Sequence, residues 1–358
     1  MFIKEGILLS ILIALGGCQS IGPKILDNDR YSYNMALYHS RNKELLLNIV
    51  RLRYDHPPIV LSVGNISGST KIQREGRLEV YSKLFTPSNA TETKAEGSTG
   101  LVYSDNPIIS YTPLDDQIFH ARFLSALNLR QIGLLLESSW SIERVFQVTI
   151  QQAGAVTNAT SAARPTSRYV PRYQRFINMV YVLRRLQLKD AFVTTYTNKD
   201  ERETLTLNLN QNAILTEHEK KILNQAGVKL YHNKIMFTNY EGPHATPVIT
   251  RSVLGIFNYL SKGVLIPPND AENGIVTITR YPNGKSFDWQ KVLEGVITIK
   301  HCEKQPTHAM VAIPYLNRWY YIDDRDAYSK QTLMMLTNII GLISGPVPSS
   351  PVGITRNA

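Results

Sequence analysis

The first eighteen residues, MFIKEGILLSILIALGGC, constrain this chain more than any other stretch. Lys4 and the amino terminus give a short positive region, and a mostly apolar run follows it up to Cys18. That run of about twelve residues is too short for a transmembrane helix, which needs about 20, and has the length of a signal-peptide core. The sequence therefore predicts an exported protein from which residues 1–17 are removed.

The ending Leu15-Gly16-Gly17-Cys18 resembles the lipobox of bacterial lipoproteins. The resemblance implies that the Cys18 thiol takes a diacylglycerol, that cleavage precedes Cys18, and that the new amino group is acylated. Two or three acyl chains attach a protein stably to a membrane. Gln19 stands where enteric-type lipoproteins retained in the inner membrane have Asp, so the resemblance implies an outer-membrane anchor, facing the periplasm. The alternatives are an uncleaved N-terminal anchor and an ordinary signal peptide with a chance cysteine.

Lipidation of Cys18 leaves Cys302 as the only other cysteine of the chain. No intrachain disulfide can then form, even in an oxidising compartment, so a packed core has to supply the stability. Hydrophobic residues make up 43% of the chain, which is enough for such a core. Removing residues 1–17 from the 358-residue chain leaves 341, the length of two ordinary domains or one large one.

The formal net charge of +10 suits an anionic neighbour such as lipid headgroups, cell-wall polymers or an acidic protein. The export signal argues against nucleic acid as a partner. The basic residues are scattered, with only short pairs such as Arg184-Arg185 and Lys220-Lys221. A diffuse excess of this kind also fits plain solubility.

The pattern of apolar residues predicts an α+β fold of mixed helices and antiparallel strands, with a β-rich C-terminal third closed by an apolar helix. We divide the chain into a signal peptide 1–17, an irregular lipidated tether 18–38, an N-terminal α+β region 39–153, a loop or linker 154–172, a C-terminal α+β region 173–344 and a disordered tail 345–358.

Helices are expected where apolar residues recur at helical spacing after a capping residue. These segments are 40–54, 115–126, 129–136, 141–152, 173–188, 216–227, 250–262 and 329–343. Strands are expected at 59–66, 77–85, 101–111, 191–197, 204–209, 229–231, 234–238, 274–281, 296–301, 309–315 and 319–322. Residues 86–100 are expected to form a polar loop, and His232-Asn233 and Asn317-Arg318 to form hairpin turns.

Three segments spread along the chain resemble a group of uncharacterised proteobacterial outer-membrane lipoproteins. They are LLLNIVRLRY (45–54) with Pro57, ISYTPL (109–114), and WYYIDD (319–324) with Ser329-Lys330. The group has no established function, so the resemblance supports an envelope location and implies no activity.

Four residues are candidates for a partner or ligand surface. Arg51 and Arg53 lie near the apolar face of the helix expected at 40–54. In the strand at 319–322, alternation places Trp319 and Tyr321 on one face and Tyr320 on the other. The chain has 19 tyrosines and 10 phenylalanines, a balance typical of surfaces that are partly apolar and partly wet. Burial of at least one face of the strand is the alternative.

A catalytic reading starts from His308 and the acids Asp323 and Asp324, which resemble the second half of a papain-like or transglutaminase-like site. Such a site needs a cysteine nucleophile well upstream, where Cys18 is expected to carry lipid. Cys302 is only six residues before His308, which makes the required geometry improbable. We predict no catalytic residue.

Two groups of residues have side chains that can bind metals, but their spacing in the sequence does not match a known metal-binding motif. His301, Cys302 and His308 lack a fourth ligand for zinc. Asp323, Asp324 and Asp326 lack the glycine turn and distal glutamate of a calcium loop, so a charged turn that caps the last helix is favoured. We predict no metal and no cofactor beyond the covalent lipid on Cys18.

These features favour a noncatalytic, lipid-anchored scaffold or accessory subunit of an outer-membrane or periplasmic assembly, such as a secretion or transport system. The alternative is a binding module for cell-wall glycan or anionic lipid. An enzyme of the papain-like or transglutaminase-like kind is the third reading.

Overall fold

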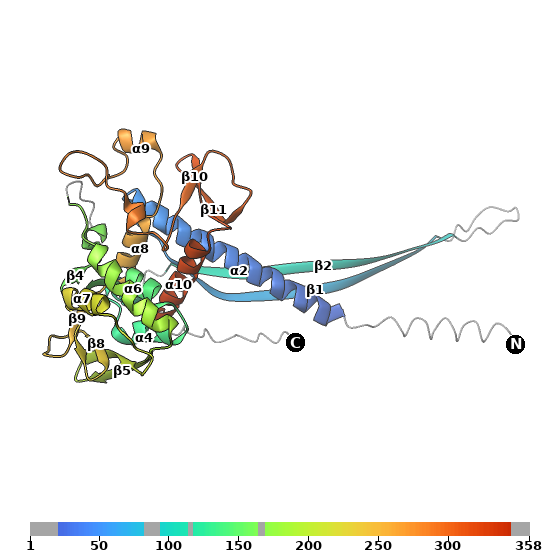
Figure 1. Ribbon diagram of the computed structural model, residues 1–358. Coiled ribbons are helices and arrows are strands. Elements are labelled where there is room, and N and C mark those ends of the chain that lie inside the picture. Colours follow the sequence, from blue (N-terminus) through green and yellow to red (C-terminus); the bar gives the residue numbers. More distant parts are fainter. Residues whose placement is uncertain (1–20, 82–93, 114–116, 164–168, 345–358) are drawn as a thin grey trace, which may run out of the picture. The chain divides into compact units, whose positions relative to one another are not determined.

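The computed structural model describes residues 21–81, 94–113, 117–163 and 169–344, which fall into two compact units (Figure 1). Unit 1 takes the chain up to Ile59 and again from Gln117 to Gly345, and unit 2 takes the intervening Val60–Asp116. Unit 1 combines helices with mostly antiparallel sheets. The predicted α+β class is confirmed.

Unit 2 is a long two-stranded antiparallel ribbon of β1 (Leu61–Tyr81) and β2 (Lys94–Pro113). The described parts of the strands expected at 59–66 and 77–85 belong to one strand, β1, and residues 94–100 of the expected loop belong to β2. Residues 82–93, which hold the end of the second expected strand and the rest of the loop, lie outside the described residues. The segment between the two expected strands contains glycines and charged residues. Cross-strand backbone pairing nevertheless continues through them, with one irregularity between Val63 and Ile66.

Helix α2 (Ile21–Arg53) is longer than expected. The predicted helix at 40–54 has the right end, but the expectation of an irregular lead is wrong for residues 21–38, which are helical. Pro23 does not prevent this, because proline is tolerated in the first turn of a helix, where its missing N–H has no intrahelical partner. The apolar face expected within LLLNIV is buried, with Leu46, Ile49 and Val50 fully inaccessible.

The larger sheet of unit 1 has the strand order β4-β3-β9-β8-β6-β5, with β7 also paired to β8. Its strands are β3 (Ile150–Ala153), β4 (Val156–Thr157), β5 (Phe192–Lys199), β6 (Arg202–Leu209), β7 (Leu230–Tyr231), β8 (Lys234–Thr238) and β9 (Thr246–Thr250). Only the β8–β9 pair is parallel. His232 and Asn233 both have positive φ, as the predicted tight turn requires.

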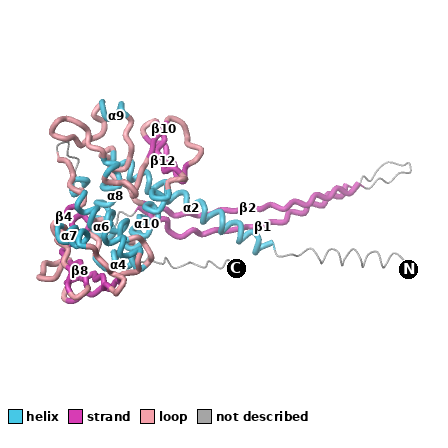
Figure 2. Tube along the Cα trace, viewed as in Figure 1, coloured by secondary structure: helices cyan, strands magenta, loops and turns pink. Residues whose placement is uncertain are grey.

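The helices of unit 1 that precede or follow these strands include α3 (Gln117–Leu124), α4 (Leu129–Glu137), α5 (Ile142–Thr149), α6 (Gln174–Leu188), α7 (Glu217–Gln225), α8 (Val253–Ser261) and the short α9 (Pro268–Glu272). Of these, α4, α5 and α6 pack against the sheet, and α9 lies away from it (Figure 2). The helix expected at 141–152 ends at Thr149, where the chain enters β3. The cap of α8 is Ser252 rather than Thr250. Because α5 packs against α6, the residues on both sides of the expected linker 154–172 belong to one unit.

The second sheet of unit 1 has three strands in the order β10-β12-β11. These are β10 (Lys300–Cys302), β11 (Ala309–Tyr315) and β12 (Arg318–Asp323), followed by α10 (Ala327–Ile343). The strand expected at 274–281 is wrong, since this segment makes only an isolated bridge from Arg280 to Ser286 around the turn at Gly284. Only the last residues of the strand expected at 296–301 are extended and paired. Helix α2 packs against β11, which brings the end of α2 to this sheet.

Candidate functional site

The hairpin between β11 and β12 turns through two residues with left-handed backbone. Leu316 has φ 46° and Asn317 has φ 60°, so the turn lies one residue earlier than expected. Asparagine enters this region readily, whereas a bulky residue such as leucine rarely does. Leu316 is also 47% exposed, so burial of its side chain does not explain the conformation. Backbone strain of this kind is concentrated at functional sites.

An open, shallow hollow of about 460 Å³ adjoins the turn. It is lined by Glu303, Pro314, Tyr315, Leu316, Asn317, Arg318 and Trp319. The lining combines two aromatic rings, a guanidinium, a carboxylate and an amide. Such a surface can stack on flat apolar groups and donate or accept hydrogen bonds around them.

Tyr315 connects the hollow to the end of α2. Its hydroxyl shares a hydrogen bond with Nδ1 of His56, and its ring packs edge-on against the rings of His56 and Tyr54 at centroid distances of 6.0 and 5.9 Å. The charge of Arg51 acts on the Tyr315 phenol, but burial outweighs it and raises the phenol pKa. The aromatic wall of the hollow is therefore held by contacts from a distant segment of the chain.

A buried polar network lies behind this wall. The Tyr54 hydroxyl donates to Oδ2 of Asp270 in α9 at 2.6 Å and shares a second hydrogen bond with the Tyr320 hydroxyl. Tyr54 is 3% exposed and Tyr320 is fully inaccessible. Burial, followed by the hydrogen bond to Asp270, raises the pKa of Tyr54, so this phenol stays protonated. The network fixes the end of α2 against β12 and α9.

The expected alternation in β12 is confirmed: Trp319 and Tyr321 are half-buried on one face, and Tyr320 is buried on the other. Of these three aromatic residues of β12, only Trp319 is among the residues that line the hollow. Tyr321 lies further along the strand, in register with Lys300 and Ala312.

The two candidate arginines have different environments. Arg51 is half-buried, and its guanidinium donates to Oδ1 of Asn48 at 3.4 Å. Arg53 is only 6% exposed, and its guanidinium donates to the Thr277 carbonyl oxygen at 3.0 Å. Burial lowers the Arg53 pKa to about 10. Arg53 is therefore part of an internal contact and is not available to a partner surface.

Lys262, which ends α8, lies near Arg53 and Asp55. Burial is the main cause that lowers its pKa to about 8, and the Arg53 charge adds to the effect while Asp55 opposes it. Its ammonium has no part in the described ion pairs or side-chain hydrogen bonds. The ends of α2 and α8 thus place the buried Arg53 and the half-buried Lys262 close enough for their charges to interact.

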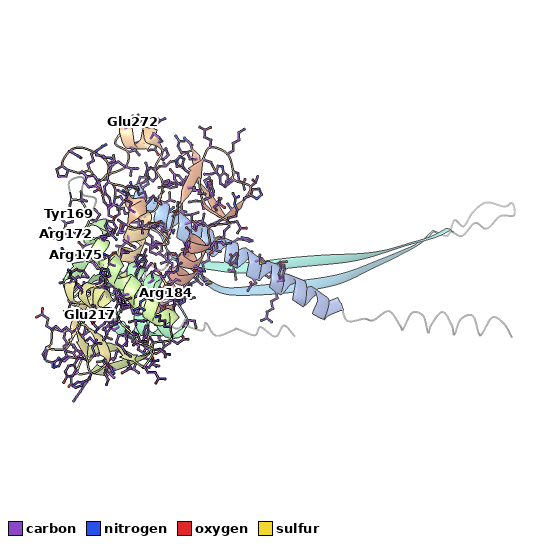
Figure 3. The ribbon with its side chains drawn as sticks, in the orientation of Figure 1. Tyr169, Arg172, Arg175, Arg184, Glu217 and Glu272 are labelled. Atoms are coloured by element: carbon purple, nitrogen blue, oxygen red, sulfur yellow. The ribbon has the colours of Figure 1, made fainter. Side chains whose placement is uncertain are left out.

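The basic pair Arg184-Arg185 is used within the fold. Arg184 donates to Oε1 of Gln187 at 2.6 Å, and Arg185 pairs with Glu219 of α7. Figure 3 places Tyr169 and Arg175 together near the start of α6, away from the β11–β12 hairpin. Both are exposed, and they therefore offer a second aromatic–basic surface for comparison with the hollow.

The catalytic reading of Cys302 and His308 finds no supporting geometry. Strand β12 lies between β10, which carries Cys302, and β11, which His308 precedes. The Cys302 thiol donates to the Lys304 carbonyl oxygen at 3.0 Å, and burial raises its pKa. An activated thiol has the opposite shift. Burial, followed by the Arg318 charge, lowers the pKa of His301.

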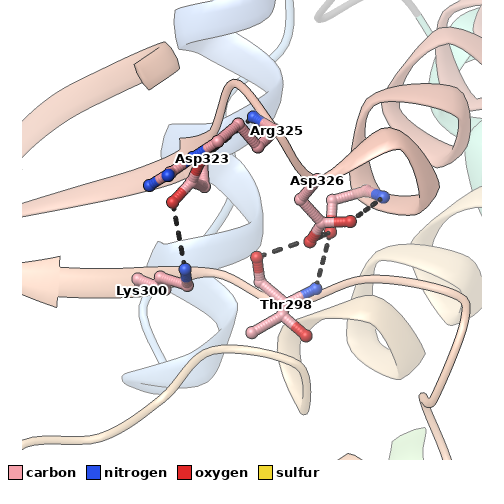
Figure 4. Close-up of polar contacts among 6 residues, drawn as sticks. Thr298, Lys300, Asp323, Arg325 and Asp326 are labelled. Atoms are coloured by element: carbon pink, nitrogen blue, oxygen red, sulfur yellow. Dashed lines mark hydrogen bonds and ion pairs between the residues drawn. The ribbon is translucent and has the colours of Figure 1, made fainter. Parts of the chain in front are cut away.

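The three aspartates form the expected charged turn and helix cap, and Figure 4 shows the contacts of Asp323 and Asp326. Asp323 pairs with Lys300 at 3.1 Å, and bonds from the Arg325 N–H and from Lys300 lower its pKa to about 2. Asp326 caps α10 by accepting the Ser329 N–H at 3.1 Å, and Asp324 pairs with Lys330 at 3.3 Å. Within the described ranges, no cluster of three or more histidines, cysteines or acids is arranged to hold a metal.

Comparisons with protein-family models, with curated proteins and with solved structures find no match to this chain. Among the described helices, none has both the length and the apolar character needed to cross a membrane. Cys18 and the signal peptide lie outside the described residues. Sequence reasoning missed Tyr315 and Arg318 as site residues, although the aromatic–basic run from Tyr315 to Trp319 was a usable signal.

Proposed function

We propose that the chain is a lipid-anchored protein of the outer membrane that faces the periplasm. It acts without catalysis as a scaffold or accessory subunit of an envelope assembly, such as a secretion or transport system, and engages a protein partner at the hollow beside Leu316. The sequence around Cys18 supports the anchor. The observation that carries the binding role is the grouping of Tyr315, Arg318 and Trp319 around an open hollow.

A protein partner suits this hollow better than a small substrate does. Tryptophan, tyrosine and arginine dominate the energetic hot spots of protein interfaces. Small-molecule sites enclose most of their ligand, whereas this hollow is shallow and open. Its walls are also ordered in advance, because β12 is paired on both edges and Tyr315 is held by His56. Binding then orders few additional side chains, which favours affinity.

Site-specific photo-crosslinking in intact cells tests the proposal. A photoreactive residue replaces Leu316 in the full chain, and a matched variant carries it at Leu230. Both leucines are 47% exposed and adjoin tight turns, but Leu230 belongs to the other sheet. We expect one defined envelope protein to be crosslinked from position 316 and not from 230. Absence of a specific product from position 316 would contradict the proposal.

Two substitutions then connect the crosslink to the hollow. Trp319→Ala and Arg318→Ala should each reduce the yield of the product about tenfold, as expected for hot-spot residues worth about 1.4 kcal/mol or more. Tyr169→Ala and Arg175→Ala change the same kinds of side chain elsewhere on unit 1 and should leave the yield unchanged. Thermal unfolding of all four variants separates loss of binding from loss of folding. Equal yields from all four would assign the partner to another surface.

Cell-wall glycan or anionic lipid is the second candidate ligand. Trp319 adjoins Arg318, Asn317 and Glu303, and an aromatic ring beside hydrogen-bonding groups can stack on a sugar ring. The net charge of +10 favours anionic polymers and headgroups. Cosedimentation with purified peptidoglycan and, separately, with anionic vesicles distinguishes these ligands from a protein partner. Binding of either that Trp319→Ala abolishes and Tyr169→Ala preserves would favour this second function.

A further inference from the structure

The β1–β2 ribbon has two free edges. Within the described part of the chain, β1 pairs only with β2, and β2 only with β1. A hairpin of two strands is marginally stable in water, and a long unpaired edge is a template for another strand. This ribbon is 21 residues long on one side and 20 on the other. The unpaired backbone groups along both edges can therefore each form hydrogen bonds with an additional strand.

We propose that a second copy of this chain occupies each edge. The free edge of β1 in one copy pairs antiparallel with the free edge of β2 in the next, head to tail. The two edges are matched in length, so one copy can cover most of the edge of its neighbour.

The distribution of apolar positions along both strands supports pairing between copies. Continuous register from Ile66 to Tyr81 places a set of apolar positions on one face of the ribbon: Ile66, Ile72, Leu78, Tyr103 and Ile109. By the same register the opposite face is mostly polar, with Lys71, Glu75 and Arg77. The division is not complete: Val102 and Ile108 share the polar face, and Arg74 and Asp105 share the apolar one. A neighbouring ribbon in antiparallel register continues both faces without a break, whereas a slip of one residue would mix them. The pattern thus fixes which registers between copies are acceptable.

The prolines of β2 define the part that can pair. Pro107 and Pro113 have no N–H to donate to a neighbouring strand, and such residues are confined to sheet edges. Lys94–Asn106 contains no proline, and neither does the whole of β1. We therefore assign the contact between copies to the part of β2 before Pro107.

Head-to-tail pairing also explains why neither edge is protected. A two-fold contact of β1 with β1 would leave both β2 edges free. A head-to-tail contact uses one edge of each kind at every junction, and it leaves no free edge when the rotation closes into a ring. The proposal does not depend on the hollow at the β11–β12 hairpin, which belongs to unit 1.

Disulfide mapping between copies tests the arrangement in the full lipidated chain, purified in detergent with Cys302→Ser as background. One tagged copy carries Gln73→Cys in β1, and a coexpressed copy with another tag carries one cysteine in β2. Ser98 and Ser104 share the face of Gln73 by register, and Thr99 and Asp105 lie on the opposite face. We expect disulfides joining the two tags from Ser98→Cys or Ser104→Cys, and at least tenfold fewer from Thr99→Cys and Asp105→Cys.

Controls and a second measurement complete the test. Leu230→Cys, an exposed position in unit 1, should form no disulfide with Gln73→Cys. Light scattering should give a mass that is a multiple of this chain. Disulfides only between two Gln73→Cys copies would overturn the head-to-tail arrangement. A monomeric mass without disulfides between copies would overturn the proposal, as would a complex containing a different protein on the ribbon.

Discussion

Tyr54 and Asp270 are 216 residues apart in the sequence and are joined by a 2.6 Å hydrogen bond from the phenol to the carboxylate. The bond connects the end of α2 to α9, and the Tyr320 hydroxyl extends it to the middle strand of the small sheet. Since Tyr54 also packs on the ring of Tyr315, the same contact supports the wall of the hollow.

Tyr54→Phe should lower the free energy of unfolding by about 1–3 kcal/mol. It removes the hydroxyl that donates to the Asp270 carboxylate, and it leaves the buried Tyr320 hydroxyl without this hydrogen-bond partner. Tyr196→Phe is the matched control. Its hydroxyl donates to Glu203 at 2.8 Å from a half-buried side chain that has no second tyrosine partner among the described residues, so the loss should be smaller, about 0.5–1 kcal/mol. Urea unfolding of both variants measures the difference. Equal losses would show that the buried network adds nothing beyond a single half-buried hydrogen bond.

Local patterns predicted the elements of this fold well where capping residues and turns define them. The Asp326 cap of α10, the turn at His232 and the buried face around Ile49 follow from neighbouring residues alone. The surroundings of the site depend on contacts between residues far apart in the sequence, which neighbouring residues do not predict. One example is the hydrogen bond from Arg53 to the Thr277 carbonyl oxygen, 224 residues away. For the same reason, the sequence pattern alone makes Arg53 a candidate for a partner surface. The long pairing of β1 with β2, which keeps β1 extended across two separately expected strands, was also missed.

The pH dependence of stability should reveal the partly desolvated Lys262. Its pKa in the folded chain, about 8, lies below the ordinary 10.5, so folding disfavours the charged form. The cost is fully present below pH 8 and disappears as the pH rises from 8 to 10.5. Lys262→Met should therefore raise the free energy of unfolding at pH 7 by about 1–3 kcal/mol, and the gain should shrink towards zero near pH 10.5.

Lys221→Met is the control for this experiment, since Lys221 is exposed on α7. Urea midpoints of both variants and the original chain, measured at pH 7 and again near pH 10, isolate the contribution of Lys262. A gain that does not change with pH would mean that packing of the methionine, and not removal of a partly desolvated charge, stabilises the variant.

The aspartates of the turn before α10 should differ in their contributions to stability. Asp326→Ala removes the side chain that accepts the Ser329 N–H and should cost about 1 kcal/mol, as capping residues do. Asp324→Ala removes a surface ion pair with Lys330 in which the aspartate side chain is 65% exposed. Its cost should be below about 0.5 kcal/mol. Thermal unfolding compares the two, and a larger loss for Asp324 would contradict the assignment of Asp326 as the cap.

The two cysteines give a direct test of the anchor. Cys18→Ala should abolish incorporation of an alkyne-labelled fatty acid and release the chain from the membrane fraction, because the acyl chains on Cys18 are the proposed anchor. Cys302→Ala should leave labelling and fractionation unchanged, since the Cys302 thiol bonds to the Lys304 carbonyl oxygen within the fold. Labelling that persists in Cys18→Ala, or that disappears in Cys302→Ala, would show that the lipid is attached elsewhere. Membrane association without any label would instead point to the uncleaved N-terminal segment as the anchor.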